Sequence, residues 1–305
     1  MPDLSPAAAE LRTLRDFLRY AITRFEEAEI AYGHGTTNSL DEAAFLILES
    51  LHLPIDNLDP FLDARLLSDE RSKLAELIDA RVTTRKPASY LLGKAYMKGI
   101  AFHVDERVIV PRSFIGELLF SDLFNGAAGG LIEDPSQVGR VLDLCTGSGC
   151  LAILAAKIFP AARIDAVDLS KDALVVARSN VEECAAGDRI KLYQGDLFGP
   201  LGRKRYDLII SNPPYVGEDV MRELPPEYAH EPRMALDGGE DGLDIVRRIL
   251  DDAPRHLTAE GGLLCEIGED REILEGEYPN LPFMWLDTQE SSGEVFWLPA
   301  SAFAD

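Results

Sequence analysis

Residues 141–152 have the sequence VLDLCTGSGCLA, and this stretch decides the fold of the chain. An apolar strand leads into a turn that contains Gly147 and Gly149, and a helix-forming apolar run follows at once. Glycine lets a backbone approach a ligand closely and adopt conformations that other residues avoid. The free N–H groups at the start of the helix suit an anionic or polar group. The pattern therefore predicts a ligand-binding turn at the end of a strand.

From residue 140 onward, short apolar segments alternate with segments of helical periodicity. The expected strands are 140–145, 163–169, 190–194, 206–211, 262–267, 283–287 and 294–298, and the expected helices are 149–158, 171–184, 242–257 and about 271–275. Short strands that alternate with helices are typical of a parallel, doubly wound sheet. The sequence thus predicts an α/β, Rossmann-like fold, in which ligands bind beyond the carboxyl ends of the strands.

The first third of the chain has a different pattern. Apolar residues recur at helical spacing between residues 7 and 85, and Asn38-Ser39 offers a helix N-cap. Lys98-Gly99 lies between two short β-prone segments and predicts a hairpin. The expected domains are a small helical domain at 1–86, a β-hairpin connector at 87–111 and the α/β domain at 112–305. Because the helical domain carries no chemical motif, we expect it to select the substrate.

The charge of the chain is strongly acidic. Its 305 residues include 53 acidic and 30 basic side chains, for a formal net charge of −23. A protein that binds duplex nucleic acid usually has a basic face, so direct binding to nucleic acid is not expected. Acidity serves solubility, and it also favours encounter with a basic protein partner. No apolar stretch has the length of about 20 residues that a membrane span needs, and no signal-peptide pattern is seen, so a cytoplasmic protein is expected.

Cysteine and histidine usage gives no sign of a metal centre. The four cysteines form no paired C-x₂-C pattern, and the five histidines are scattered. Most of the cysteines lie in or beside apolar runs, where cysteine is usually a small core residue. The chain is therefore expected to hold no metal and to be reduced.

Three aspartates follow three successive strands of the expected sheet. Asp143 precedes the glycine turn, Asp168 ends the second strand and Asp196 follows the third. A carboxylate accepts two hydrogen bonds at once, so Asp168 suits a ribose diol, while Asp196 suits an adenine edge and Asp143 an amino-acid group. S-adenosylmethionine carries all three groups. Each aspartate alone is more often a cap or turn residue, but three of them at one sheet edge favour this cofactor.

The expected cofactor site also includes residues that flank these aspartates. It comprises Asp143, Thr146, Gly147, Ser148, Gly149, Asp168, Leu169, Asp196, Leu197 and Asn212. The glycine turn also fits a dinucleotide fingerprint, with Asp168 about 20 residues beyond it. A nicotinamide dehydrogenase therefore stays open, although the Tyr90-x-x-x-Lys94 pair precedes the glycine turn, in the wrong order for a short-chain enzyme.

Residues 207–215, with the sequence DLIISNPPY, form the second motif. The motif ends the expected fourth strand, so Asn212 should face the same crevice as the glycine turn. Pro213 and Pro214 fix the backbone and remove two N–H donors. Carbonyl oxygens and the side-chain oxygen of Asn212 remain, and such acceptors can hold an NH₂ group by its two hydrogens. Tyr215 can cover a flat group, because aromatic faces pack on planar amides and bases.

This motif fits methyl transfer to a planar NH₂ group. Such a nitrogen is a poor nucleophile because its lone pair is delocalised, whereas a sulfonium methyl is already activated. The enzyme must mainly align the reacting atoms, which can supply roughly 7–11 kcal/mol, and fixed acceptors favour charge build-up on nitrogen. The expected catalytic residues are Asn212, Pro213 and Tyr215, and the expected substrate-binding residues are Asn212, Pro213, Pro214 and Tyr215. In isolation, the motif is also typical of a rigid turn after a strand.

Over nearly its whole length, the chain resembles the HemK/Prm family of protein glutamine methyltransferases. The resemblance lies in the helical N-terminal part and in residues 90–93, 110–112, 143–149, 212–215 and 231–243. Many methyltransferases share the glycine turn and fewer share Asn-Pro-Pro-Tyr, but their combination with Pro111-Arg112 and the Gly238-Gly239 segment is specific. The resemblance implies a class I methyltransferase that uses S-adenosylmethionine and methylates the side-chain amide nitrogen (N5) of a glutamine in a protein.

Two branches of this family differ after the Pro111-Arg112 pair. In the branch that modifies peptide-chain release factors, Pro, an acid, Thr and Glu usually follow. Residues 113–118 here are SFIGEL, which resembles the PrmB branch, although Phe114 stands where that branch often has proline. The final segment, residues 292–297, also fits that branch. The resemblance implies a basic partner, the third large-subunit (50S) ribosomal protein.

Besides the dehydrogenase, three other functions stay open at this point. The chain could methylate a release factor with the same chemistry. A nucleic-acid amino methyltransferase acting on adenine or guanine would use the same Asn-Pro-Pro-Tyr turn, but the acidic charge and the lack of a large basic insert disfavour it. A non-catalytic scaffold that only binds the cofactor is disfavoured by the intact Asn212.

Overall fold

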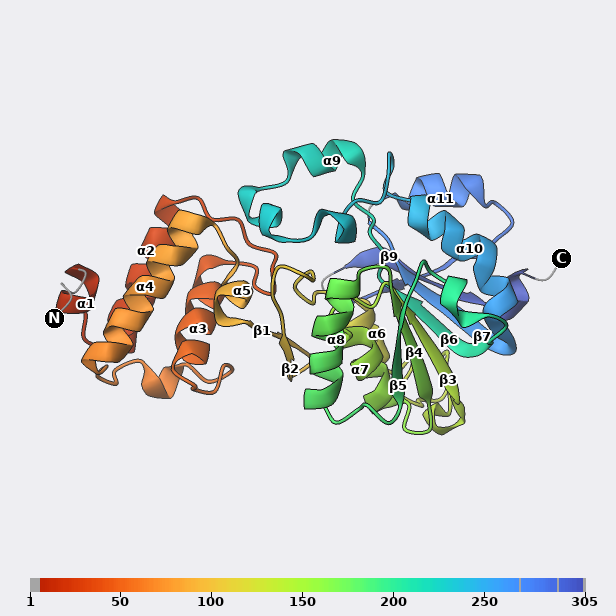
Figure 1. Ribbon diagram of the computed structural model, residues 1–305, viewed down its shortest axis with the longest axis horizontal. Coiled ribbons are helices and arrows are strands. Elements are labelled where there is room, and N and C mark those ends of the chain that lie inside the picture. Colours follow the sequence, from red (N-terminus) through yellow and green to blue (C-terminus); the bar gives the residue numbers. More distant parts are fainter. Residues whose placement is uncertain (1–5, 269, 290, 304–305) are drawn as a thin grey trace. The chain divides into compact units, whose positions relative to one another are not determined.

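The computed structural model describes residues 6–268, 270–289 and 291–303, which form two compact units (Figure 1). The helical unit contains residues 6–95, 104–106 and 225–230. The α/β unit contains residues 96–103, 107–224 and the described residues from 231 to 303. Six residues from the second half of the sequence therefore belong to the helical unit.

The helical unit has the helices that the apolar periodicity predicts between residues 7 and 85, and the short α5 follows them. They are α1 (Pro6–Glu10), α2 (Leu14–Glu27), α3 (Ser39–Ser50), α4 (Ser68–Thr84) and α5 (Ala88–Leu92), with a 3₁₀ turn at Asp59–Phe61. The predicted N-cap of α3 is present, since the side chain of Asn38 accepts the backbone N–H of Asp41 at 2.9 Å. Phe17, Phe25 and Leu46 are fully buried in the core that these helices share.

The predicted hairpin is confirmed as strands β1 (Lys94–Met97) and β2 (Ile100–His103). Its two turn residues, Lys98 and Gly99, have φ angles of +50° and +73°. Positive φ at both central positions is the geometry of the tight hairpin turn whose twist matches that of the strands.

The α/β unit is built on a seven-stranded sheet with the order β5-β4-β3-β6-β7-β9-β8 (Figure 1). The strands are β3 (Arg140–Leu144), β4 (Arg163–Asp168), β5 (Ile190–Gln194), β6 (Tyr206–Ser211), β7 (Leu257–Glu266), β8 (Met284–Asp287) and β9 (Ser292–Pro299). Strands β5, β4, β3, β6 and β7 are parallel. The strand order reverses beside β3, so the ends of β3, β4 and β6 open a crevice where ligands usually bind. The predicted α/β, Rossmann-like fold is confirmed.

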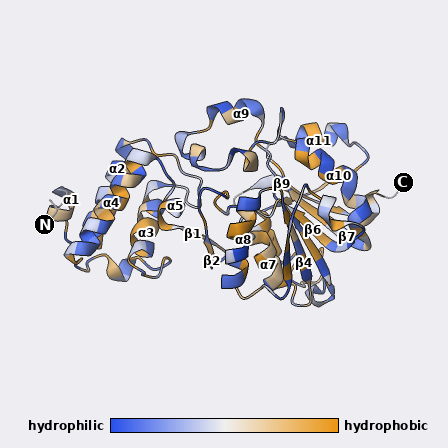
Figure 2. Ribbon diagram, viewed as in Figure 1, coloured by the Kyte–Doolittle hydropathy of each residue, from blue (hydrophilic) through white to orange (hydrophobic). Residues whose placement is uncertain are grey.

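Helices cover both faces of this sheet. The helices of the unit are α6 (Ile115–Leu119), α7 (Cys150–Ile158), α8 (Lys171–Glu183), α10 (Asp244–His256) and α11 (Arg271–Glu277), together with the short α9 (Glu218–Glu223) in the loop after β6, which has no buried residue. Helix α7 packs on β3 and β4 and α8 on β5, whereas α10 packs on β7. In Figure 2 the apolar residues concentrate in the strands and in α7, because the central strands are covered on both faces.

The sheet departs from the sequence expectation in two places. Strand β9 runs antiparallel to β7 and to β8, so the sheet is not wholly parallel. The connection from Asp287 to Ser292 is too short for the crossover that a parallel pair needs. Strand β7 begins at Leu257 rather than at residue 262, because Leu257 pairs with Tyr206 of β6 before an irregularity in the register. The short helices α5, α6 and α9 were not predicted, since five or six residues give little periodicity.

Within the described ranges, no helix has both the length and the apolar character that crossing a membrane requires.

Candidate active site

Asp143 holds the glycine turn in place through hydrogen bonds. Its side chain is 0% exposed, and Oδ2 accepts the hydroxyl of Thr146 at 2.5 Å and the backbone N–H of Ala152 at 3.0 Å. The other oxygen, Oδ1, is buried and has no hydrogen-bond partner among the described residues. Burial raises the pKa of Asp143 to about 7. This aspartate therefore joins β3, the turn and the first turn of α7 into one rigid piece.

The turn itself depends on left-handed backbone conformations. Cys145, Gly147 and Gly149 have φ angles of +58°, +54° and +80°. A non-glycine residue with such an angle is uncommon, so Cys145 is held there by its surroundings. A Cβ atom added at Gly147 would meet no heavy atom within 4 Å, whereas one at Gly149 would lie 3.3 Å from Ala177 Cβ. The lack of a side chain at Gly149 thus allows close packing against Ala177, and Gly147 leaves open space beside the backbone.

Asp168 at the end of β4 links two of the predicted cofactor elements. Its Oδ2 accepts the backbone N–H of Gly147 at 2.8 Å, and its Oδ1 accepts that of Ser170 at 2.8 Å. Burial raises the pKa of this carboxyl above its usual range. Each carboxylate oxygen can accept more than one hydrogen bond, so Asp168 can hold the turn and still accept a ligand hydroxyl.

A cavity of about 200 Å³ opens at the ends of these strands, within the α/β unit. The predicted cofactor residues in its lining are Gly147, Asp168, Leu169, Asp196, Leu197 and Asn212. Asp143, Thr146, Ser148 and Gly149 lie outside the lining. The residues in the lining can contact a ligand directly, whereas the residues outside it support the glycine turn.

Asp196 enters the cavity wall as one member of an ion pair. Its Oδ2 lies 2.6 Å from Nη2 of Arg248 on α10, and about half of each side chain is exposed. An exposed pair of this kind contributes little to stability. Arg248 can therefore move aside if an adenine edge takes its place, which leaves the predicted role of Asp196 chemically possible.

Asn212 presents an unused acceptor at the end of β6. It lines the cavity together with Pro214, and its Oδ1 is buried without a hydrogen-bond partner in the described part of the chain. A buried polar atom without a partner is costly, so a native structure that keeps one usually has a use for it. The neighbouring Pro213 is buried and lies outside the cavity lining. The free oxygen of Asn212 fits the NH₂ donor that the sequence predicts.

Glycines surround the backbone of Tyr215. A Cβ atom at Gly238 would lie 2.8 Å from Tyr215 Cα, and one at Gly242 would lie 2.3 Å from the Tyr215 carbonyl oxygen. The backbone N–H of Val216 donates to the carbonyl of Leu236 at 2.8 Å. The glycine-rich segment that carries part of the family resemblance therefore clamps the backbone after Asn-Pro-Pro-Tyr, and any side chain there would displace the turn.

Glu266 is a buried carboxylate that sequence reasoning missed. It is 0% exposed, and its Oε2 accepts the hydroxyl of Ser113 at 2.6 Å and the backbone N–H of Phe114 at 2.9 Å. Its Oε1 accepts the hydroxyl of Tyr215 at 3.2 Å. Glu266 thus joins β7 to the segment after Pro111-Arg112 and to the Asn-Pro-Pro-Tyr turn.

The surroundings of Glu266 set two pKa values. Burial raises the pKa of Glu266 to about 7, against the hydrogen bonds from Ser113 and Tyr215, which favour the charged form. Burial also raises the pKa of Tyr215, and the carboxylate of Glu266 adds to this. The Tyr215 hydroxyl therefore stays protonated and serves as a donor. An acid inside the apolar run of residues 262–267 was the signal that could have found Glu266.

Arg112 explains the Pro-Arg pair of the sequence. Its two terminal nitrogens bind both carboxylate oxygens of Glu231, and Oε1 of Glu231 also accepts the backbone N–H of Val110 at 3.0 Å. A two-pronged arginine–carboxylate contact fixes orientation as well as distance. It joins residue 231, at the end of the loop that follows Asn-Pro-Pro-Tyr, to the segment that leads into α6.

Comparisons with known proteins show which family the chain resembles. The family model of the methyltransferase small domain (MTS) matches residues 130–225. A ribosomal protein uL3 glutamine methyltransferase of Bradyrhizobium diazoefficiens is 59% identical over 293 residues, which are 96% of this chain and 92% of that protein. The enzyme with the same name from Bordetella pertussis is 55% identical over 289 residues, 95% of each chain.

A solved structure with the same fold is the catalytic domain of hMettl16 in complex with the MAT2A 3′UTR hairpin 6. It has a TM-score of 0.51 and 16% identity, and it covers 75% of this chain and 83% of that one. At this identity the likeness concerns the fold alone. The sequence relatives, in contrast, confirm the predicted resemblance to the PrmB branch of the protein glutamine methyltransferases. With more than half of its residues identical over nearly the full length, the chain belongs to the family of ribosomal protein uL3 glutamine methyltransferases.

Proposed function

We propose that this protein transfers a methyl group from S-adenosylmethionine to the side-chain amide nitrogen of a glutamine in ribosomal protein uL3. The observation that carries the proposal is the buried Oδ1 of Asn212, which has no hydrogen-bond partner among the residues described and belongs to a residue that lines the cavity beside the glycine turn. The names of the relatives supply the substrate. Because ribosomal proteins are made and assembled in the cytoplasm, the enzyme acts there.

The residues of the cavity fit this cofactor. Gly147 leaves open space for close approach of a ligand, and Asp168 can accept the hydroxyl groups of a ribose. Asp196 can accept the amine of an adenine in place of Arg248. When bound, S-adenosylmethionine supplies an activated methyl group. The proposed cofactor residues that line the cavity contact it, and Asp143, Thr146, Ser148 and Gly149 hold the turn in shape.

Asn212 and Pro213 hold the glutamine amide. The Oδ1 atom of Asn212 accepts one hydrogen of the NH₂ group and the carbonyl oxygen of Pro213 accepts the other, with Pro214 and Tyr215 beside the amide plane. These fixed acceptors align the nitrogen and favour the positive charge that develops on it during the transfer. No base is needed before the attack, because the nitrogen becomes acidic only once it is methylated.

The direct test is mass spectrometry of ribosomal proteins after reaction. A mixture of ribosomal proteins and release factors from cells that lack the enzyme is incubated with the purified protein and labelled cofactor. We expect one added methyl group on a glutamine of uL3. Label on a release factor alone, or on the RNA of a matched nucleic-acid sample alone, would show that this molecule is the substrate and uL3 is not.

A further inference from the structure

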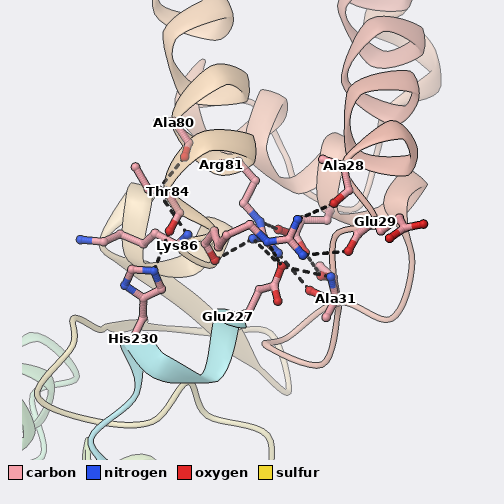
Figure 3. A network of polar contacts seen from close by, with 12 residues as sticks. Ala28, Glu29, Ala31, Ala80, Arg81, Thr84, Lys86, Glu227 and His230 are labelled. Carbon is pink, nitrogen blue, oxygen red and sulfur yellow. Dashed lines mark hydrogen bonds and ion pairs between the residues drawn. The ribbon is translucent and has the colours of Figure 1, made fainter. Parts of the chain in front are cut away.

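The helical unit contains a buried polar network centred on a carboxylate from the second half of the chain (Figure 3). Oε1 of Glu227 lies 2.8 Å from Nε of Arg85 and 3.7 Å from Nη1 of Arg81. The same oxygen accepts the backbone N–H of Ala31 at 3.1 Å. Glu227 and Arg81 are both 0% exposed. The network is therefore part of the core of the unit and not a surface ion pair.

Glu227 is the second carboxylate of this core. Arg81 also binds the buried Glu42, and it donates to the backbone carbonyls of Arg85 at 2.9 Å and Ala31 at 3.1 Å. Two arginines thus face two glutamates. Without Glu227, Arg85 would lose its carboxylate partner and the fully buried Arg81 would keep Glu42 alone, and breaking a buried ion pair by removal of one partner is strongly unfavourable.

Two neighbours of Glu227 fix the same six-residue stretch, residues 225–230. The ring of Tyr228 lies 4.4 Å from that of His34, and a Cβ atom at Gly33 would lie 2.9 Å from the Tyr228 hydroxyl. Nε2 of His230 lies 2.8 Å from the carbonyl oxygen of Thr84 (Figure 3). The stretch is anchored at Glu227, Tyr228 and His230, so it has one defined position in the helical unit.

The anchored stretch lies in the chain between two segments of the cavity wall. Asn212 and Pro214 line the cavity on one side of it in sequence, and Pro232, Met234 and Ala235 line the cavity on the other. The chain leaves the α/β unit after residue 224 and returns at residue 231. A loop whose two ends form the wall of the active site is therefore held in its middle by the helical unit.

We propose that Glu227 is a positioning residue for methyl transfer to the protein substrate. The proposal rests on the proposed function, methyl transfer from S-adenosylmethionine to a glutamine of uL3. Glu227 restricts the conformations of residues 216–231. The Asn212 acceptor and the stretch after Glu231 therefore keep their productive arrangement while the substrate protein is bound. Misplacement of reacting groups by about 1 Å can lower a rate by about 100-fold, so a remote anchor can control turnover.

The test compares Glu227→Gln with the wild-type enzyme. Gln keeps the size and an acceptor for Ala31 but removes the charge. Single-turnover methylation is measured at saturating uL3 and cofactor, and calorimetry of S-adenosylhomocysteine gives the affinity and the fraction of competent enzyme. Glu223→Gln is the matched control, because this exposed carboxylate lies in the same loop, four residues earlier. Hydrogen exchange over residues 212–237 reports on the loop independently of activity.

We expect the Glu227→Gln rate to fall roughly 10- to 100-fold, with cofactor affinity within about twofold, full stoichiometry and faster exchange over residues 216–224. Tyr228→Leu, which loosens the same stretch without a charge change, should show the same pattern and decides the matter if Glu227→Gln does not fold. An unchanged rate, or a rate that falls only in proportion to the competent fraction, overturns the proposal. Wild-type enzyme inactive on uL3 would instead reject the proposed function.

Discussion

Asp168→Asn offers a sharp test of how the cofactor site is held. The carboxylate accepts the backbone N–H groups of Gly147 and Ser170 with one oxygen each, both at 2.8 Å. Asparagine is the same size but has only one acceptor oxygen, so its NH₂ group must face one of these N–H donors. One hydrogen bond to a charged acceptor is lost, at about 1.5–3 kcal/mol. Either the glycine turn or the start of α8 then loses its link to the end of β4.

The expected result is a cofactor affinity about 10- to 100-fold lower, since 1.4 kcal/mol corresponds to a factor of ten. Calorimetry with S-adenosylhomocysteine measures the affinity, and denaturant unfolding shows how much of the loss comes from stability. Asp172→Asn is the matched control, because Asp172 is exposed in the first turn of α8. Wild-type affinity in Asp168→Asn would refute the reasoning, as would equal losses in both variants.

Three further predictions concern Tyr215, Glu266 and the helical unit. Tyr215→Phe should lower the single-turnover rate less than changes at Asn212 do, because the flat ring remains and only the bond to Glu266 is lost; a loss as large as that of Asn212→Ala would contradict this. Thermal melts at several pH values should show that wild-type stability falls between about pH 4.5 and pH 7 more than that of Glu266→Gln. The folded protein holds the Glu266 proton to about pH 7, whereas the unfolded chain releases it near its ordinary value of 4.5, so the charged form costs stability as pH rises; equal slopes would contradict this. A truncated protein that starts near Pro87 should bind cofactor but not methylate uL3, and full methylation by a folded truncation would show that the helical unit does not select the substrate.

The sequence was most informative where chemistry and local geometry coincide. The glycine turn, the hairpin at Lys98-Gly99 and the ends of β5 and β6 follow from residue type and spacing alone. Asn212 could be placed at the crevice because a parallel sheet brings the ends of its strands to one edge. These features depend on neighbours within a few positions of the chain.

Contacts between distant residues could not be predicted in the same way. Glu266 meets Ser113 and Tyr215 across 153 and 51 positions of the chain. The Glu227 network joins residues separated by 196 positions. Only the folded chain brings such groups together, and a single glutamate in a sequence gives no sign of whether it is buried. The strand β9 was predicted, but its antiparallel direction was not, since periodicity indicates strands and not their direction.

The central claim is that Asn212 holds the reacting amide through an oxygen that has no partner in the described part of the protein. The most direct measurement is single-turnover methylation of uL3 by Asn212→Ala and Asn212→Asp at saturating cofactor. Both should lose about 10²–10³-fold in rate, the scale seen when one preorganised transition-state partner is removed, while cofactor affinity changes far less. A folded Asn212→Ala enzyme with a near-normal rate would show that the amide is held elsewhere.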